Sequence, residues 1–211
     1  MRNLLLSLTL LLSGGACASG TPGQFDYYVL ALSWSPDHCA ERPSDRGQCG
    51  RPLGFVLHGL WPQYWRGYPS DCTQQPAPRD ARDKFPGLYP SDFLFTHEWK
   101  KHGTCSGLVP DAYYALSKKA KQSISIPTAY RQPKTPFRAD SNQLKADFAR
   151  INPGMNPESI AVFCSGSGRF MKEILVCLDK TGGHSVSCSA EVDHKARKSC
   201  AGPDFLVSNV R

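Results

Sequence analysis

The sequence predicts an α+β fold in a single domain, and three observations support this fold class. The chain has 211 residues, of which 40% are hydrophobic and 20% charged, and this size and composition are typical of one globular domain. Strand-like and helix-like segments follow one another without the regular alternation of a parallel α/β sheet. Nine cysteines favour an exported domain that is stapled by disulfides.

Four runs of aromatic and aliphatic residues predict β-strands. These runs cover residues 25–34, 53–57, 160–164 and 173–178. We expect a break at Gly59 after the second run. The last two runs are separated by a glycine-rich turn.

Three segments predict α-helices, and the rest of the chain predicts loops. The first helix runs from a capping Ser91 to a stop at Gly103. Two more helices cover residues 110–122 and 141–151, and Ser141 is expected to cap the last one. The predicted loops cover residues 66–90, residues 118–138 and the short basic segment at the end of the chain.

The first residues have the pattern of a secretory signal peptide. Arg2 precedes an apolar run from Leu4 to Leu12, and small residues follow up to Ala18. The run is too short to cross a bilayer, which takes about 20 apolar residues. We expect cleavage after Ala18, with lipid attachment at Cys17 as the alternative.

The expected division of the chain is a signal peptide at residues 1–18 and one domain at residues 19–211. Cleavage removes one of the 25 basic residues and leaves 18 acidic ones, so the mature net charge is +6, which favours polyanionic partners. Eight cysteines remain, and an even number in an exported chain predicts disulfides. Spacing alone leaves the pairing open among roughly 105 possibilities. The expected location is the periplasm or the medium.

A short segment from Phe55 to Pro62 carries the first candidate for chemistry. A predicted strand ends there at His58, and Gly59 allows another group to approach closely. Trp61 and the proline after it form a wall beside the histidine. The alternative is a core histidine packed against a tryptophan.

A second segment, from His97 to Cys105, gathers titratable groups on the first predicted helix. Glu98 and His102 are four residues apart and share one helix face, and His97 and Lys101 share the neighbouring face. A solvated face of salt bridges is the alternative, although the tryptophan and cysteine of this segment tie it to the core. The two histidines are five residues apart, so a regular helix cannot direct both to one metal ion as in a zinc metalloprotease.

Two histidines can act together as a general base and a general acid near neutral pH. RNA supplies an internal nucleophile, its 2′-hydroxyl, which attacks the adjacent phosphorus when a base removes the proton. The acid protonates the departing 5′-oxygen, and lysine or protonated histidine stabilises the charge on the phosphoryl oxygens. The residue types in the two segments are sufficient for this reaction without a metal ion or another cofactor.

The two segments resemble the signatures of the ribonuclease T2 family of acid endoribonucleases, which includes the plant self-incompatibility ribonucleases. They are HGLWP at residues 58–62 and HEWKKHGTC at residues 97–105. The resemblance spans roughly residues 25–200 and is dense up to Cys105. It implies a central antiparallel β-sheet flanked by helices in one domain, stapled by disulfides.

The resemblance also implies catalytic roles at the matched positions. His102 is expected to be the general base on the 2′-hydroxyl, and His58 the general acid on the leaving oxygen. Glu98 and Lys101 are expected to stabilise the transition state. Water then hydrolyses the 2′,3′-cyclic phosphate to a 3′-phosphate, with the roles of the two histidines exchanged.

The residues expected to bind substrate are Trp61, Gln63, Tyr64, Trp65 and His97. The resemblance places Trp61 where the family stacks a base and His97 where it holds phosphate. Gln63 stands where some family members have aspartate. An amide both donates and accepts hydrogen bonds, and aromatic side chains stack on any base, so we expect broad base specificity.

The resemblance further implies disulfides Cys72–Cys105 and Cys164–Cys200. The four other cysteines of the mature chain are then left to pair with their neighbours in sequence, as Cys39–Cys49 and Cys177–Cys188. The first bridge is expected to fasten a loop to the catalytic helix.

These observations predict a periplasmic or secreted monomer that cleaves single-stranded RNA and not DNA, without a metal ion, a cofactor or a membrane span. One alternative is a catalytically silent relative that binds RNA, which should lack one of the two histidines. Another is a metal-dependent nuclease or phosphatase, which needs clustered carboxylate ligands. Glu98 has no acidic neighbour in either segment.

Overall fold

Strand β1 (Tyr27–Trp34) lies inside the sheet, and apolar side chains cover both of its faces. In this computed structural model, which describes residues 20–211, β1 pairs with β2 (Phe55–Gln63) on one side and with β5 (Phe170–Leu178) on the other, both antiparallel. The predicted signal peptide lies outside the described residues.

The remaining strands extend the sheet on the far side of β5. They are β3 (Phe137–Asp140), β4 (Ile160–Ser165) and β6 (Asp204–Val207). The sheet order is β2-β1-β5-β6-β3, and β4 pairs with β5 off this path. All pairs are antiparallel except β5 with β6, so the expected antiparallel sheet is confirmed with one parallel contact.

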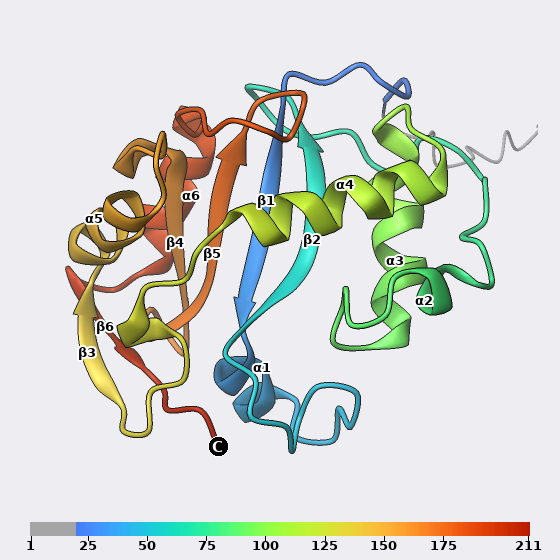
Figure 1. Ribbon diagram of the computed structural model, residues 1–211. Helices are drawn as coiled ribbons and strands as arrows, with labels where there is room; N and C mark the ends of the chain where they lie inside the picture. The colour runs from blue at the N-terminus through green and yellow to red at the C-terminus, as the bar shows by residue number, and fades with distance from the viewer. Residues whose placement is uncertain (1–19) are drawn as a thin grey trace, which may run out of the picture.

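Helices flank both faces of the sheet (Figure 1). Their bounds are α1 Ser35–Glu41, α2 Ala81–Lys84, α3 Asp92–Lys101, α4 Pro110–Ser123, α5 Ser141–Ile151 and α6 Ala190–Ser199. Short 3-10 turns lie at η1 Gly103–Cys105, η2 Thr128–Tyr130 and η3 Pro157–Ser159. None of the helices within residues 20–211 combines the length and the apolarity that crossing a membrane requires.

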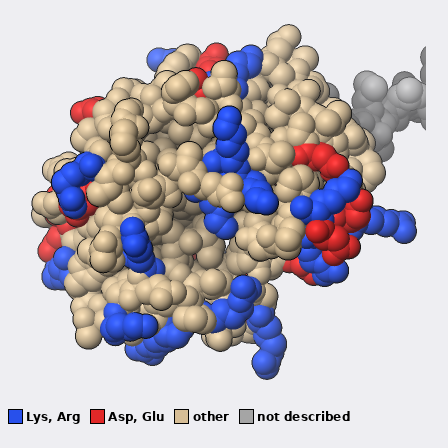
Figure 2. All heavy atoms as spheres, in the orientation of Figure 1, with Lys and Arg blue, Asp and Glu red and all other residues tan. Residues whose placement is uncertain are grey.

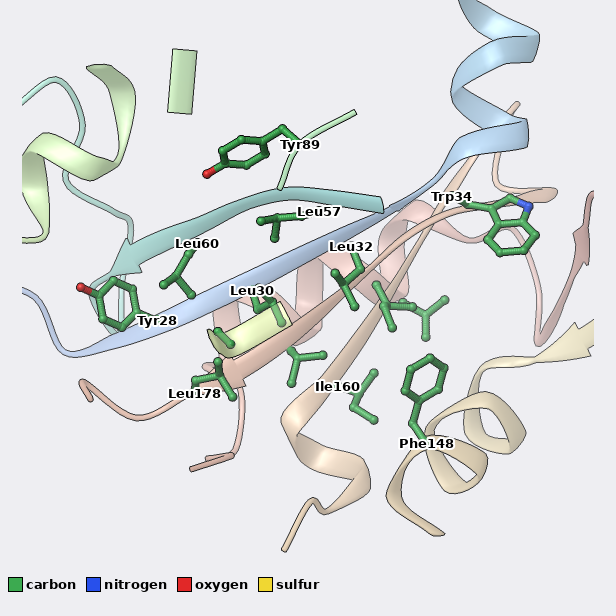
Figure 3. Close-up of a cluster of buried hydrophobic side chains, with 14 of the residues drawn as sticks. Tyr28, Leu30, Leu32, Trp34, Leu57, Leu60, Tyr89, Phe148, Ile160 and Leu178 are labelled. Carbon is green, nitrogen blue, oxygen red and sulfur yellow. The ribbon is translucent and has the colours of Figure 1, made fainter. Parts of the chain in front are cut away.

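The two faces of the sheet are covered to different extents. Helices α4 and α5 cover one face over a large core. Figure 3 shows part of this core, which includes Leu30 and Leu32 of β1 and Phe148 of α5. On the opposite face, Val192 and Ala196 of α6 cover a smaller cluster. The part of this second face that α6 leaves uncovered carries the candidate site.

Several elements differ from the sequence prediction. Strand β2 does not break at Gly59 but continues to Gln63, because a β-bulge takes up one residue within the strand. Asp140, rather than Ser141, caps α5, since its carboxylate accepts hydrogen bonds from the backbone N–H groups of Asn142 and Gln143. The segments predicted as loops contain α2, β3, α6 and β6, and α1 was not predicted at all.

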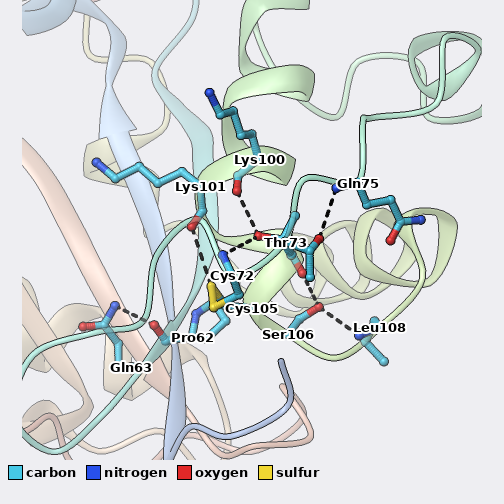
Figure 4. Close-up of a disulfide and its surroundings, with 12 residues drawn as sticks. Pro62, Gln63, Cys72, Thr73, Gln75, Lys100, Lys101, Cys105, Ser106 and Leu108 are labelled. Atoms are coloured by element: carbon cyan, nitrogen blue, oxygen red, sulfur yellow. Dashed lines mark hydrogen bonds between the residues drawn. A yellow bond between two sulfur atoms is a disulfide. The ribbon is translucent and has the colours of Figure 1, made fainter. Parts of the chain in front are cut away.

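Four disulfides staple the domain, and their pairings are those expected. They are Cys39–Cys49, Cys72–Cys105, Cys164–Cys200 and Cys177–Cys188. Figure 4 shows that Cys72–Cys105 joins the chain before α2 to the turn that follows α3. Beside it, the backbone N–H of Cys72 donates to Thr104 Oγ1 (3.1 Å), which fastens the same junction.

Charged side chains are unevenly spread over the face that carries α4. Figure 2 shows Lys and Arg over the centre and lower part of this face, while Asp and Glu gather with them on the side of α2. There Lys84 pairs with Asp111 at 2.7 Å. Such exposed pairs contribute little to stability. The charged residues of this region therefore balance one another without adding much to the stability of the fold.

Candidate active site

The bulge in β2 places His58 on the uncovered face of the sheet. Ala31 of β1 pairs with Gly59, and the next residue of β1, Leu32, pairs with Leu57, so His58 has no partner opposite it in β1. At a bulge the extra residue leaves the regular alternation of side chains between the two faces of the sheet. Bulges are common next to active sites. The His58 side chain is 38% exposed and therefore accessible to a ligand.

Polar groups lie on both sides of the His58 ring. Its Nδ1 is 3.2 Å from Ser33 Oγ and 3.6 Å from Glu173 Oε2. Its Nε2 is 3.8 Å from Glu98 Oε1. The imidazole is thus held between a carboxylate of β5 and a carboxylate of α3.

Gly59 and Trp61 bring Glu98 into the site. Trp61 Nε1 donates a 2.7 Å hydrogen bond to Glu98 Oε2. A Cβ atom on residue 59 would lie 2.0 Å from that oxygen and 2.2 Å from the indole nitrogen, so only glycine leaves room for this hydrogen bond. Glu98 is fully buried, and its Oε1 has no hydrogen-bond partner among the described residues.

His102 lies at the C-terminal end of α3, where the helix gives way to η1. Its ring stacks on Trp61, with centroids 5.1 Å apart, and Trp61 meets His58 edge-on at 5.2 Å. His102 is 6% exposed, and its Nδ1 has no hydrogen-bond partner among the described residues. Trp61 therefore contacts both histidines as well as Glu98.

The environments of these groups move their pKa values in different directions. Burial, with the neighbouring charges of Lys101, His97 and His58, lowers the pKa of His102 to about 2. Burial also lowers the pKa of His58, but its interaction with Glu173 and the charges of Glu98 and Glu173 outweigh this and raise it. Near neutral pH, His102 is thus the neutral ring, and His58 is the ring biased toward the protonated form.

Burial raises the pKa of Glu98 to about 7, against the opposing effects of His58, the Trp61 hydrogen bond and Lys101. A carboxyl group with this pKa exists in both forms near neutral pH and can either accept or donate a hydrogen bond. Lys101 is half-buried, and its side chain extends away from the disulfide in Figure 4. Its charge acts on His97, Glu98 and His102 together.

The residues expected to bind substrate lie in three different settings. Trp61 is in the site, and His97 stacks on the exposed Phe93 with centroids 5.3 Å apart. Gln63 is buried, and its amide donates to the backbone oxygen of the preceding proline (3.1 Å; Figure 4). Tyr64 packs against the core.

Trp65 is the most accessible of the expected stacking residues, with 53% of its surface exposed. It stacks on Tyr27 of β1, with centroids 5.0 Å apart. Direct contacts thus join His58, Trp61, Glu98 and His102 into one cluster. Gln63, Tyr64 and Trp65 have their contacts with other parts of the chain.

Two groups at the site were absent from the sequence prediction, Ser33 and Glu173. Ser33 lies within a run that predicts a buried strand, and Glu173 lies at the start of another such run. A polar side chain in such a run is a usable signal, because it costs free energy unless it faces solvent or a partner. Its partner is set by the pairing of strands far apart in sequence, which the pattern alone does not show.

A cavity of about 450 Å³ opens beside His58, and Trp61 is not among the residues that line it. It is bounded by Glu173, by Phe93 and His97 of α3, and by α1 with the loop that follows it. Among the residues that the structure describes, no group of three or more His, Cys, Asp or Glu side chains is arranged to hold a metal ion.

The sequence is similar to ribonucleases over its whole length. A ribonuclease from Aeromonas hydrophila is 43% identical, with both chains covered completely. Ribonuclease 1 of Arabidopsis thaliana is 27% identical over 95% of this chain and 96% of its own. Ribonuclease I of Escherichia coli K12 is 25% identical over 74% of this chain and 76% of its own.

The fold is similar to that of ribonuclease MC1 from bitter gourd seeds. The TM-score is 0.69 at 20% sequence identity, and the match covers 86% of this chain and 99% of the other. The model of the ribonuclease T2 family matches residues 25–188, which include both signature segments. The chain therefore belongs to the ribonuclease T2 family of RNA endonucleases.

Proposed function

We propose that this protein is a periplasmic or secreted endoribonuclease that cleaves single-stranded RNA through a 2′,3′-cyclic phosphate to 3′-phosphate ends, without a metal ion. The observation that carries the proposal is the pair of histidines in opposite environments. One is buried among positive charges and the other lies between two carboxylates, and Trp61 contacts both. A neutral and a protonated imidazole are the two groups that this reaction requires.

In the first step His102 removes the proton of the 2′-hydroxyl, because its lowered pKa keeps it neutral. The 2′-oxygen attacks phosphorus, the bond to the 5′-oxygen breaks, and His58 gives its proton to that oxygen. In the second step His58, now neutral, activates water against the cyclic phosphate, and His102 returns its proton to the 2′-oxygen. Both histidines end in their starting forms.

Glu98 and Lys101 act on the charge that develops on the phosphoryl oxygens. The Lys101 ammonium attracts that charge, and a protonated Glu98 donates a hydrogen bond to it. The pKa of about 7 makes the protonated form of Glu98 available at and below neutral pH. His97 contributes to phosphate binding beside them.

Base binding is proposed for Trp61, Gln63, Tyr64 and Trp65, with low base specificity. The exposed Trp65 offers a stacking surface that any base can use. Cleavage of DNA is not expected, because DNA has no 2′-hydroxyl. We further propose a monomer without a membrane span, exported by a signal peptide at residues 1–18.

The experiment uses the mature, oxidised protein with single-stranded RNA in excess EDTA, and a DNA strand in parallel. We expect RNA ends that carry cyclic phosphate by mass spectrometry, no DNA cleavage, and about a 1,000-fold loss of kcat in His102→Ala. The matched control is His194→Ala, at an exposed position of α6, with wild-type activity. Loss of activity in EDTA, or cleavage of DNA, contradicts the proposal, and RNA binding without cleavage favours a silent relative.

A further inference from the structure

Glu173 is a nearly buried carboxylate that faces the candidate general acid. Its side chain is 13% exposed, and its Oε2 lies 3.6 Å from His58 Nδ1. That oxygen has no hydrogen-bond partner among the described residues, and the imidazole at 3.6 Å is placed to compensate its burial. Ser33 Oγ lies 3.2 Å from the same nitrogen.

The sheet fixes this arrangement. Ser33 in β1 and Glu173 in β5 are direct partners in the antiparallel register, so their side chains lie on the same face of the sheet. The bulge in β2 turns His58 toward that face. Three strands, rather than a mobile loop, therefore set the position of the ring relative to both polar groups.

The charged groups that act most directly on His58 lie on β5 and α3, while α1 and the loop after it bring Asp37, His38, Glu41, Arg42 and Asp45 to the same cavity. Glu173 and the exposed Lys172 lie on β5, and Glu98, with His97 and His102 beyond it, lies on α3 and at its end. The two carboxylates are closest, one on the Nδ1 side and one on the Nε2 side. A protonated imidazole has an N–H donor on each side, so the setting matches the charged ring.

We propose that Glu173, assisted by Ser33, is a positioning residue that binds His58 Nδ1–H and keeps Nε2 directed toward the reacting phosphate. The inference rests on the proposed role of His58 as general acid. Glu173 does not touch the substrate and acts through the histidine alone. The balance of charges that raises the pKa of His58 supports the same role.

The role covers both steps of the reaction. When His58 gives its Nε2 proton to the 5′-oxygen, the remaining proton stays on Nδ1, because Glu173 and Ser33 accept from it. The neutral ring then has its lone pair on Nε2, which is the nitrogen that must remove a proton from water. Glu173 thus selects the tautomer that the second step requires, without being protonated itself.

The test measures the pKa of His58 by NMR of 15N-labelled histidines, together with the pH profile of kcat/KM on a dinucleotide. In Glu173→Gln we expect the pKa of His58 to fall by about one unit, since the charge that favours protonation is lost. The alkaline limb of the profile should move to lower pH by the same amount. Activity should fall about tenfold at pH values above this limb and little at pH values below it. Glu173→Asp should restore most of the shift.

The matched control is Glu41→Gln, which removes one negative charge from the exposed end of α1 on the same cavity. It should leave the pKa of His58 and the profile unchanged. An unchanged His58 pKa in both Glu173 variants would overturn the inference. The NMR titration does not depend on catalysis, so it separates this outcome from a failure of the proposed function, in which RNA is not cleaved at all.

Discussion

The bulge of β2 and the C-terminal end of α3 each present one histidine to Trp61, and the two regions treat the same side chain in opposite ways. His58 is partly exposed and lies between the carboxylates of Glu98 and Glu173. His102 is buried, stacks on the indole and has positive neighbours. The pKa of the first ring is raised, and that of the second is lowered to about 2.

The two rings show that placement alone moves the pKa of one residue type in opposite directions. Burial lowers the pKa of both rings, so burial does not separate them. The sign of the neighbouring charges separates the pKa values of the two rings. Trp61 and Glu98 connect the two regions, and changes to one region or to this connection should therefore have separable effects.

Releasing the His102 region should cost the most stability. The disulfide Cys72–Cys105 spans a sequence separation of 33 and holds the turn after α3. In the double variant Cys72→Ser, Cys105→Ser we expect the free energy of unfolding to fall by about 3–4 kcal/mol, because a bridge restricts the unfolded chain. Urea unfolding at constant pH measures this change.

The matched control is the double variant Cys39→Ser, Cys49→Ser, whose bridge spans a separation of 10. This control variant should lose slightly less stability. Where both double variants are folded, it should keep the higher kcat, because the Cys39–Cys49 bridge does not border His102. Equal losses of kcat in the two double variants would mean that the fastening of α3 is unimportant for the proposed role of His102.

The next effect tests the connection between the two regions. In Gly59→Ala the new methyl group takes the space of the Trp61–Glu98 hydrogen bond, since Cβ would lie 2.0 Å from Glu98 Oε2. Overpacking of this kind costs about 1–3 kcal/mol, and we expect kcat/KM to fall about 100-fold, which corresponds to about 2.7 kcal/mol. Steady-state kinetics on a dinucleotide measures it.

Gly202→Ala provides the comparison, because nothing lies within 4 Å of its expected Cβ atom. Its activity should equal that of the wild type. If Gly59→Ala were equally silent, Glu98 could move away from Trp61 without consequence, and the connection between the two histidine regions would carry no function.

The sequence predicts the two histidine regions unequally. The α3 region is local: its cap position, its stop and the shared face of Glu98 and His102 follow from spacing within a few residues, and the structure has the helix there. The β2 region is not local. The bulge at His58 depends on pairing with β1, and the approach of Glu173 depends on pairing between β1 and β5.

The C-terminal elements show the same limit. Helix α6 has only two buried apolar side chains, and β6 is four residues long, so neither has a strong periodic pattern of its own. Helix α6 forms because it packs against β4, and β6 forms because it pairs with β3 and, at one position, with β5. The sequence therefore identifies the candidate residues, whereas the sheet decides which charges surround each of them.

Trp61 itself should tolerate a conservative replacement best. Trp61→Phe keeps an aromatic ring against both histidines but removes the N–H that donates to Glu98 Oε2. That hydrogen bond lowers the pKa of Glu98, so its loss should raise the pKa further above its ordinary value. Glu98 also loses the hydrogen bond that holds it in position, and we therefore expect kcat to fall about tenfold, which corresponds to about 1.4 kcal/mol.

Trp34→Phe is the control, since it removes a comparable indole hydrogen bond, to the backbone oxygen of Ser208 (3.1 Å), in the core on the other face of the sheet. It should reduce stability and leave kcat of the folded enzyme unchanged. A large loss of substrate affinity in Trp61→Phe, with kcat intact, would instead make Trp61 mainly a stacking surface for a base. The indole would then serve the substrate more than it serves Glu98, and the two histidine regions would be coupled only through the backbone between them.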